Sequence, residues 1–455
     1  MIPVTHMHGK SVLVLGLGGS GLATAEALKA GGAKVLAFDD NEAQVSKARA
    51  AGIDCEDLRD VDFDGFEALV LSPGIPLTHP EPHWSVKKAQ AAGVAIIGDV
   101  ELFNRERLAV APNCPFIAIT GTNGKSTTTA LLSHMLSVAG LDVQMGGNIG
   151  RAVLTLDPLA TDKCYVVECS SYQIDLAPSL KPSVGVHLNI SPDHIDRHGT
   201  VEHYADVKAR LVVGADHAVV GVDDPLSIKI ADHCDAKDVS LTRVSLSCEA
   251  AVSACGSEIF NGDASVAKVA GISSLRGEHN LQNAAIAYAV CHKMGLDDAT
   301  IQKGLDSFGG LPHRLEQVAE RDGVFFVNDS KATNADAAAK ALASFDKIYW
   351  ILGGLPKEGG IQSLNEFFPK IVHAFLIGEA AEAFGHTLAG IVPYSMSETL
   401  AVATRDAVAM SAERSVEANE TVAVLLAPAC ASWDQFSSFE ARGDAFKSSV
   451  KLELN

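Results

Sequence analysis

Residues 116–127 read Phe116-Ile-Ala-Ile-Thr120-Gly121-Thr122-Asn123-Gly124-Lys125-Ser126-Thr127, a short apolar run followed by a loop of glycine, hydroxyl and lysine residues. The apolar run predicts a strand, and Thr128–Ala139, with its leucines on one side, predicts a helix. Strand, glycine-rich loop and helix in this order are typical of a P-loop, whose backbone N–H groups cradle phosphates. The segment therefore predicts an α/β domain that binds a nucleotide.

Two side chains of this loop have distinct chemistry. In a P-loop the lysine, here Lys125, reaches the terminal phosphates, and the hydroxyl that follows it, here on Ser126, can ligate Mg²⁺. The common pattern has its first glycine where this chain has Ile119. Because strand, Gly-Lys-Ser and helix agree with one another, we interpret the segment as a phosphate site and not as a plain glycine turn.

Two further predicted strands carry candidate metal ligands at their carboxyl ends. Tyr165–Glu168 ends in a carboxylate at the edge where open α/β sheets keep their sites, so Glu168 is a candidate Mg²⁺ ligand. The strand Val184–Asn189 leads into a polar loop, residues 191–198. In that loop His194 is a second candidate, because it follows a P-loop and a strand that ends in a carboxylate.

The N-terminal region contains a second glycine-rich loop. Val12–Leu15 predicts a strand, Leu22–Ala30 predicts a helix, and Gly16-Leu17-Gly18-Gly19-Ser20-Gly21 lies between them. Asp39 follows the next predicted strand, where the acid that binds a ribose lies in dinucleotide-binding domains. Taken alone, the loop is compatible with an NAD-dependent oxidoreductase or with a tight turn that packs a helix on a strand.

The chain is 455 residues long, which is enough for about three domains. The alternation of strand, turn and helix restarts at Ser11, at Phe116 and at Val324, and it predicts parallel α/β architecture throughout. The other strands predicted in the last third are Ile348–Leu352, Ala374–Ile377 and Val422–Leu426. Because glycine and proline cluster near residues 111–113 and 309–312, we predict domains over residues 1–111, 112–311 and 312–455.

Composition excludes several classes of function. Asp and Glu outnumber Lys and Arg by 56 to 36, so we expect no nucleic-acid partner. The nine cysteines are scattered, with no C-x-x-C pair, and they predict reduced thiols in place of disulfides or a zinc site. We also expect no targeting segment and no membrane insertion, and therefore a cytoplasmic protein.

Several motifs resemble the Mur ligase superfamily, which also contains the folylpolyglutamate synthetases. In the central region they are G-T-N-G-K-S-T at 121–127, V-V-E-C-S-S-Y-Q at 166–173, L-N-I-S-P-D-H-I-D-R-H at 188–198 and R-G-E-H-N-L-Q-N at 276–283. Others resemble the family members that add D-glutamate: G-L-G-G-S-G-L at 16–22, L-S-P-G-I at 71–75, G-L-P-H-R at 310–314, N-D-S-K-A-T-N at 328–334 and L-A-P-A-C-A-S-W-D-Q-F-S-S-F-E-x-R-G at 426–443. The resemblance covers essentially the whole chain.

The resemblance implies a fold and a reaction. It implies an N-terminal Rossmann-like domain for a UDP-linked substrate, a central P-loop ATPase-type domain with a mostly parallel sheet, and a C-terminal Rossmann-like domain for an amino acid. The reaction it implies is ATP-dependent addition of D-glutamate to UDP-N-acetylmuramoyl-L-alanine through an acyl phosphate. This step belongs to peptidoglycan biosynthesis, and with it to cell shape and cell division.

The resemblance also assigns binding residues, position by position. The UDP-linked substrate is assigned to Gly19, Ser20, Gly74 and Asn148. ATP is assigned to Gly121, Thr122, Asn123, Gly124, Lys125, Ser126, Thr127, Asn280, Asn283, His313, Arg314, Asp329 and Lys331. D-glutamate is assigned to Thr333, Lys357, Ser432, Trp433 and Phe439.

The catalytic residues implied in the same way are Lys125, Glu168, His194 and Lys208. The implied metal ligands are Ser126, Glu168, His194 and Lys208, for two Mg²⁺ ions. Lys208 lies in the predicted helix Val201–Leu211 and taken alone would be a solvated lysine; the resemblance implies that CO₂ converts it to a carbamate. The expected protein is a monomer.

Three alternatives stay open at this point. The first is another amide ligase of the superfamily, acting on a later muropeptide or on folate, which would respond to a different amino acid. The second is an NAD-dependent dehydrogenase, which would bind NADH. The third is a non-catalytic P-loop switch, which would lack substrate-dependent ATP turnover.

Overall fold

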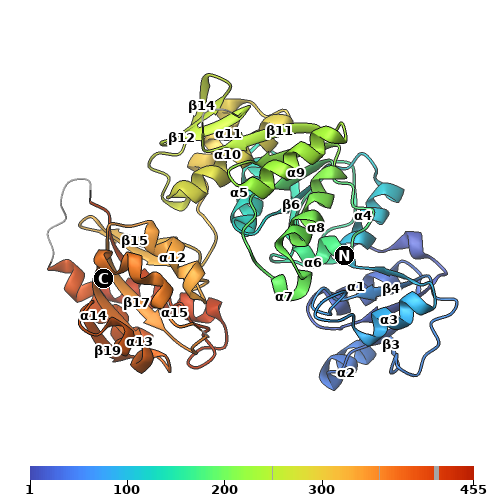
Figure 1. Cartoon of the computed structure of the whole chain (residues 1–455), viewed down its shortest axis with the longest axis horizontal. Coiled ribbons are helices and arrows are strands. Elements are labelled where there is room, and N and C mark those ends of the chain that lie inside the picture. Colours follow the sequence, from blue (N-terminus) through green and yellow to red (C-terminus); the bar gives the residue numbers. More distant parts are fainter. Residues whose placement is uncertain (248–249, 358, 414–419, 455) are drawn as a thin grey trace. The chain divides into compact units, whose positions relative to one another are not determined.

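A computed structural model describes residues 1–247, 250–357, 359–413 and 420–454 of the chain. Its contacts divide the chain into two compact units, drawn in Figure 1. Unit 1 comprises residues 1–270 and 278–308, and unit 2 comprises residues 271–277 and 309–455. The predicted α/β class is confirmed, because three largely parallel sheets with flanking helices account for the fold.

The first sheet of unit 1 is wholly parallel, with strand order β3-β2-β1-β4-β5. Its strands are β1 (Ser11–Leu15), β2 (Lys34–Phe38), β3 (Asp54–Cys55), β4 (Ala68–Leu71) and β5 (Ala95–Ile97), and its helices are α1 (Ser20–Ala30), α2 (Glu42–Ala50), α3 (Trp84–Ala91) and α4 (Asp99–Val110). Alternate residues of β1 feed two different cores, since Val12 and Val14 pack in one cluster and Leu13 and Leu15 in another. Both faces of this sheet are therefore covered, as expected for a Rossmann-like layer.

The second sheet of unit 1 has the order β14-β13-β12-β11-β10-β9-β6-β8-β7. Its strands are β6 (Phe116–Thr120), β7 (Asp142–Gly147), β8 (Lys163–Glu168), β9 (Val184–His187), β10 (His217–Gly221), β11 (Ser240–Ser245), β12 (Val252–Cys255), β13 (Glu258–Asn261) and β14 (Ala264–Lys268). Pairing is parallel from β7 to β12 and antiparallel at the β13 and β14 end. The helices are α5 (Lys125–Val138), α6 (Ser171–Asp175), α7 (Ile195–His198), α8 (Val201–Val213), α9 (Pro225–Ala236), α10 (Glu278–Lys293) and α11 (Asp298–Asp306).

Unit 2 contains one sheet with the order β15-β16-β20-β17-β18-β19, parallel except for β15. Its strands are β15 (Glu316–Arg321), β16 (Val324–Asn328), β17 (Lys347–Gly353), β18 (Ile371–Ile377), β19 (Tyr394–Glu398) and β20 (Val422–Leu426), and its helices are α12 (Ala335–Ala343), α13 (Ala381–Leu388), α14 (Leu400–Ala412) and α15 (Phe439–Leu454). Alternate residues of β17 again enter two cores, Trp350 with Leu352 and Tyr349 with Ile351.

Residues 271–277 pack with unit 2, although the chain on either side of them belongs to unit 1. Within this segment the Arg276 guanidinium lies over the rings of Phe325 and Phe345, at 4.2 and 5.2 Å from the ring centroids. Cation–π contacts of this kind stabilise the position of this short segment, which contains one 3₁₀ turn, η3 (Ser273–Leu275). The predicted domain limits after residues 111 and 311 stay predictions.

Helix α5 begins earlier than the sequence pattern predicts. We expected a helix from Thr128, but it begins at Lys125, because Gly124 takes a left-handed φ of 84° at the N-cap. Such a φ suits glycine, which has no Cβ, and it turns the chain directly into the helix. Lys125, Ser126 and Thr127 therefore lie in the first helical turn, where backbone N–H groups have no partner within the helix.

Gly21→Ala is expected to destabilise the first sheet of unit 1. A Cβ at Gly21 would lie 1.8 Å from the carbonyl oxygen of Gly16, whereas a Cβ at Gly18 in the same loop meets nothing within 4 Å. Overpacking of this kind costs about 1–3 kcal/mol. Thermal unfolding of the whole chain should show a lower first transition for Gly21→Ala and an almost unchanged one for the control Gly18→Ala; equal transitions for the two variants would contradict the close approach.

Candidate active site

The glycine-rich loop between β6 and α5 is folded back on its own lysine. The Lys125 Nζ donates to the carbonyl oxygens of Gly121 and Thr122, both at 2.9 Å. A Cβ at Gly124 would lie 2.4 Å from the side-chain oxygen of Asn283, so only glycine allows α10 to approach the loop this closely. The loop thus presents an ammonium group and a helix N-terminus together, which is the arrangement that binds phosphates.

The loop after β9 holds this glycine-rich loop in place. The backbone N–H of Thr122 donates to the Asn189 carbonyl at 2.9 Å, and that of Asn123 donates to the Asn189 side chain at 2.9 Å. The Thr122 hydroxyl donates to the Ser191 carbonyl at 3.2 Å and lies 3.2 Å from the Tyr204 hydroxyl. The polar segment that carries His194 therefore starts beside the phosphate loop, as the sequence pattern predicts.

Glu168 ends β8 and is 1% exposed. One carboxylate oxygen accepts from the Asn148 side chain at 2.7 Å, and the backbone N–H of Asn148 donates to the Glu168 carbonyl at 2.9 Å. The other carboxylate oxygen is buried, and within the described part of the chain it has no hydrogen-bond partner. A buried carboxylate oxygen without a donor is costly, and a cation would satisfy it.

Lys208 is buried, whereas a lysine on an ordinary helix surface is solvated. Its Nζ donates to the Gly121 carbonyl at 2.9 Å and to the Thr120 hydroxyl at 3.2 Å, and it lies 4.7 Å from the centroid of the Tyr204 ring. Burial, followed by the positive charge of Lys125, lowers the pKa of Lys208 well below its ordinary value of 10.5. The Lys208 Nζ therefore contacts the phosphate loop at Gly121 and the end of β6 at Thr120.

His194 has a left-handed φ of 53° at the N-cap of α7. Its side chain is about half exposed, with Nε2 3.4 Å from a carboxylate oxygen of Asp193 and the ring 5.0 Å from that of Tyr172. A β-region residue at this cap would direct the chain elsewhere, so the left-handed turn sets where the imidazole leaves the loop.

The predicted adenine residues lie on α10 behind the phosphate loop. Asn280 and Asn283 are 5% and 2% exposed, and the Asn283 amide donates to the Asn280 side-chain oxygen at 3.2 Å. The Asn283 side chain is also the one that faces Gly124. Asn283 thus lies next to Gly124, and Asn280 lies beside Asn283.

The N-terminal glycine-rich loop uses its acid internally. The Asp39 carboxylate accepts from the backbone N–H of Leu17 at 2.6 Å and from that of Asn41 at 2.8 Å, so each oxygen is bonded to the protein's own backbone. This favours the tight-turn interpretation over a ribose-binding acid. Gly19 caps α1 with φ 41° and Ser20 begins the helix, while the Gly74 carbonyl accepts from Arg197 at 3.0 Å.

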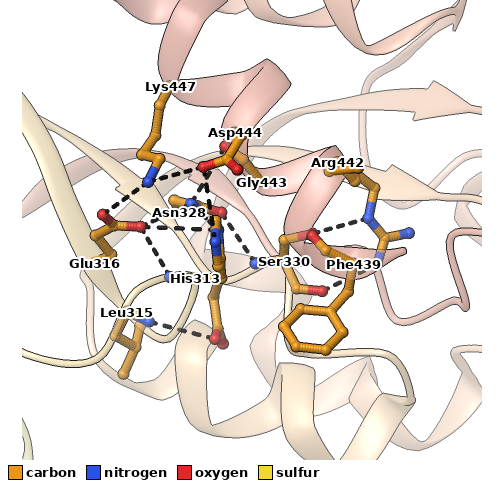
Figure 2. A network of polar contacts seen from close by, with 12 residues as sticks. His313, Leu315, Glu316, Asn328, Ser330, Phe439, Arg442, Gly443, Asp444 and Lys447 are labelled. Atoms are coloured by element: carbon orange, nitrogen blue, oxygen red, sulfur yellow. Dashed lines mark hydrogen bonds and ion pairs between the residues drawn. The ribbon is translucent and has the colours of Figure 1, made fainter. Parts of the chain in front are cut away.

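The other predicted ATP residues lie in unit 2, where His313 belongs to a polar network (Figure 2). His313 has a left-handed φ of 61°; its Nδ1 lies 3.0 Å from the Asn328 amide nitrogen, and its backbone N–H donates to Glu316 at 2.8 Å. A Cβ at Gly443 would lie 2.1 Å from the same Nδ1, which explains the glycine at that position. The predicted ATP set is therefore divided between the two units.

Asp329 and Lys331 flank this network. Asp329 is 6% exposed, and burial raises the pKa of its carboxyl to about 7, against the opposing charge of Arg314. The Lys331 Nζ lies 4.0 Å from the centroid of the Phe439 ring. Asp329 follows β16 directly, so both residues lie at the carboxyl edge of the parallel strands of unit 2.

The residues predicted to bind the amino acid gather at the same edge. They lie in the segments that follow three adjacent parallel strands and at the start of α15: Thr333 after β16, Lys357 after β17, Ser432 and Trp433 after β20, and Phe439 on α15. Ser432 is buried, Lys357 is exposed, and Trp433 is 73% exposed. An indole of that exposure lies where a ligand or solvent is its neighbour.

Comparison with known proteins assigns the chain to a family. The Mur ligase middle domain matches residues 119–291, and the Mur ligase MurD-like N-terminal domain matches residues 10–98. A protein of Rhizobium meliloti (strain 1021) named UDP-N-acetylmuramoylalanine--D-glutamate ligase is 58% identical over 452 residues, which cover 98% of this chain and 97% of that protein. The chain belongs to the Mur ligase family. A protein of the same name from Brucella abortus (strain 2308) is 54% identical over 457 residues, 99% of this chain and 97% of that one.

Solved Mur ligases share the fold. A UDP-N-acetylmuramate-alanine ligase of Thermotoga maritima covers 97% of this chain and 99% of its own, with a TM-score of 0.58 and 15% identity. MurF from Acinetobacter baumannii covers 99% of this chain and 92% of its own, with a TM-score of 0.58 and 18% identity. These structures confirm the expected three-domain α/β architecture of the Mur ligase family.

A different group of side chains could hold a metal ion by distance alone. Ligand atoms of Asp175, His198 and His203 lie within 4.8 Å of one another, and the sequence did not single these residues out. Asp175, however, pairs with Arg210 at 3.0 Å, and the buried His198 has its Nε2 2.9 Å from the Ser171 hydroxyl. These contacts account for Asp175 and for one ring nitrogen of His198, whereas the His198 Nδ1 is buried and has no hydrogen-bond partner among the described residues.

Other expectations concern the thiols and the membrane. The eight cysteines that the structure describes are free; Cys248 lies outside the described residues. Burial raises the pKa of Cys114 to about 11 and of Cys430 to about 12. In the described ranges, none of the helices has the length and apolar character needed to span a bilayer.

Asp329→Asn is expected to stabilise this Mur ligase at alkaline pH. The folded-state pKa of about 7 lies above the ordinary value of 3.8, so the folded state holds its proton more tightly than the unfolded state does. The stability contributed by that proton is complete below pH 3.8 and is lost as the pH rises through 7. Calorimetry without ligands should therefore give similar Tm values for variant and parent near pH 4, and a variant more stable by on the order of 2–4 kcal/mol at pH 8. A constant difference between pH 4 and 8 would contradict the raised pKa.

Proposed function

We propose that this Mur ligase joins D-glutamate to UDP-N-acetylmuramoyl-L-alanine with the hydrolysis of ATP, as a step of peptidoglycan synthesis. The observation that carries the proposal is identity of 54–58% over nearly the whole chain to proteins named UDP-N-acetylmuramoylalanine--D-glutamate ligase. The phosphate loop, with Glu168 and Lys208 beside it, supplies the chemistry that such a reaction needs. Asp39, bonded to its own backbone, weakens the dehydrogenase alternative.

The reaction needs a leaving group better than oxide on the carboxylate of the L-alanyl residue. A carboxylate oxygen attacks the γ-phosphorus of ATP and ADP leaves, which gives an acyl phosphate. The amine of D-glutamate then attacks the acyl carbon, loses a proton, and inorganic phosphate leaves as the amide forms. Catalysis of this kind is mostly positioning and charge neutralisation, in which Lys125 faces the terminal phosphates.

The residues around the phosphate loop suit Mg²⁺. Glu168 has one carboxylate oxygen that is buried and lacks a donor, which is the observation that favours a cation there. Ser126 and His194 would complete the ligands, and we propose two ions, as the family resemblance implies. Bound Mg²⁺ would neutralise negative charge on the phosphates.

Lys208 is the residue for which we propose a covalent modification. A lowered pKa favours the neutral amine of this buried lysine, and its nitrogen would attack the carbon of CO₂. Loss of one proton from the nitrogen then leaves a carbamate anion. The anion would replace the positive charge beside Thr120 and Gly121 and support the second ion. The alkyl chain needs no rearrangement to reach the loop, because Nζ already touches it.

We also propose which residues bind the UDP moiety and D-glutamate, the oligomeric state and the location of the protein. We assign the UDP moiety to Gly19, Ser20, Gly74 and Asn148. We assign D-glutamate to Thr333, Lys357, Ser432, Trp433 and Phe439. We further propose a monomer that works in the cytoplasm, where its ATP is and where its free thiols stay reduced.

An amino-acid panel tests the function. Phosphate release from ATP and Mg²⁺ with UDP-N-acetylmuramoyl-L-alanine is expected to rise with D-glutamate and not with L-glutamate, L-alanine or meso-diaminopimelate. Lys125→Ala should lose at least about 10²–10³ in rate and serves as the control for contaminating ATPases. Stimulation by another amino acid would point to a different ligase of the superfamily, and release that no amino acid stimulates would favour a nucleotide switch.

Lys208→Ala is expected to be severely impaired and partly restored by acetate or propionate. The small acid would occupy the vacated space and return the negative charge of the carbamate. Lys208→Arg should stay inactive with either acid, because a guanidinium keeps its positive charge and fills the space. Turnover with and without the acid, at matched ionic strength, measures the effect; a Lys208→Ala variant as active as the parent would remove the carbamate from the mechanism.

A further inference from the structure

Arg442 is a buried arginine of α15 whose donors all go to loops. It is 1% exposed. Its Nε donates to the Ser330 hydroxyl at 3.0 Å, and its Nη2 donates to the Ser330 carbonyl at 3.0 Å and to the Cys430 carbonyl at 3.1 Å. Its Nη1 donates to the Ala431 carbonyl at 3.2 Å. Figure 2 shows the guanidinium facing Ser330 and Phe439.

Each loop that meets Arg442 carries residues assigned to the amino acid. Ser330 belongs to the segment after β16 that leads to Thr333, and Cys430 and Ala431 directly precede the assigned Ser432. The Ser330 hydroxyl also donates to the Phe439 carbonyl at 2.8 Å, which fixes the start of α15.

The loop after β17 packs against Ala431, one of the residues that accept from Arg442. Gly354 has a φ of 132°, and a Cβ there would lie 2.4 Å from the Ala431 carbonyl and 3.1 Å from Arg442 Nη1. The backbone of Leu355 exchanges two hydrogen bonds with that of Ala431, at 3.0 and 3.1 Å. The turn that leads to Lys357 is thereby bonded to the segment after β20, and Arg442 in turn bonds that segment to the one after β16.

This arrangement has an electrostatic cost. Four oxygen atoms accept hydrogen bonds from Arg442, namely three carbonyl oxygens and one hydroxyl. Burial lowers the pKa of the guanidinium to about 10, so Arg442 remains a cation at neutral pH. In the described part of the chain no hydrogen bond or ion pair joins this guanidinium to a carboxylate, although the charge of Asp434 opposes the lowering of its pKa. Burying a cation in this way is expensive. A neutral side chain could pack there at lower cost, but it could not make these four hydrogen bonds to the segments after β16 and β20, and it would supply no positive charge beside them.

We propose that Arg442 is the positioning residue of the amino-acid half of the site: it holds the segments after β16, β17 and β20 in register for an anionic amino acid. The inference rests on the proposed function, because that function supplies D-glutamate as the anion. Arg442 acts through the loops and does not touch the reacting atoms.

Kinetics of Arg442→Lys test the inference. Lysine keeps the charge but not the planar fork, so kcat/KM for D-glutamate should fall about 10²-fold, mainly through KM for D-glutamate. The KM for UDP-N-acetylmuramoyl-L-alanine should stay within about twofold, since the residues assigned to it lie in unit 1. In Arg442→Ala, methylguanidinium should restore part of the affinity for D-glutamate, whereas methylammonium should not.

Arg107 is the matched control. It is 2% exposed and donates to the carbonyls of Pro112, Cys114 and Lys181 at 3.1, 3.2 and 2.7 Å, but all of these lie in unit 1. Arg107→Lys should lower Tm and leave KM for D-glutamate unchanged. If Arg442→Lys behaves as Arg107→Lys does, with a lower Tm and an unchanged KM, Arg442 is only a structural residue and the inference is overturned.

Ser330→Ala keeps the inference testable if neither Arg442 variant folds. It removes the hydroxyl that accepts from Nε and leaves the guanidinium in place, and it should raise KM for D-glutamate about tenfold. An unchanged KM in Ser330→Ala would overturn the inference. If the parent enzyme responds to a different amino acid in the panel, the proposed function fails, and the same variants tested with that amino acid still decide the role of Arg442.

Discussion

Parallel pairing around β6 is the constraint on which the phosphate site depends. Strand β6 lies between β8 and β9 and is parallel to both. The carboxyl ends of these three strands therefore meet at one edge of the sheet. That edge receives the glycine-rich loop, Glu168 and the segment that begins at Asn189. Every hydrogen bond that braces the loop, such as that from Thr122 to Asn189, follows from this strand order.

Predictions from the sequence were most accurate where chemistry and periodicity act locally. The apolar runs at β6 and β20 were predicted to the residue, because buried parallel strands need uninterrupted apolar side chains. The start of α5 was placed three residues late, because the left-handed Gly124 allows the helix to begin inside the loop. Periodicity has no means of detecting such a cap.

Contacts between polar residues distant in the chain could not be predicted from pattern. Asn148 was assigned to the UDP moiety, yet its side chain bonds to Glu168, and this pairing depends on β7 lying beside β8. Arg442 was visible only as one letter of a motif, because its role depends on bonds to two segments, at Ser330 and at Cys430, that are about a hundred residues apart in the chain. The same holds for Lys208, whose burial reverses what its helical position indicates. The chain has a net charge of −20, which repels anions at long range. Lys208 and Arg442 are nevertheless buried at loops, where their local charge, and not the net charge of the chain, acts on a bound anion.

Because unit 2 includes residues 271–277, it is not formed by one continuous stretch of the chain. The chain passes between the two units three times, after residues 270, 277 and 308, so a fragment that begins at Gly309 lacks a piece of its own fold. It would leave the rings of Phe325 and Phe345 without the guanidinium of Arg276. Recombination between relatives at a single crossover near residue 309 would pair this segment with a foreign partner surface, so the segment and unit 2 have to be inherited together.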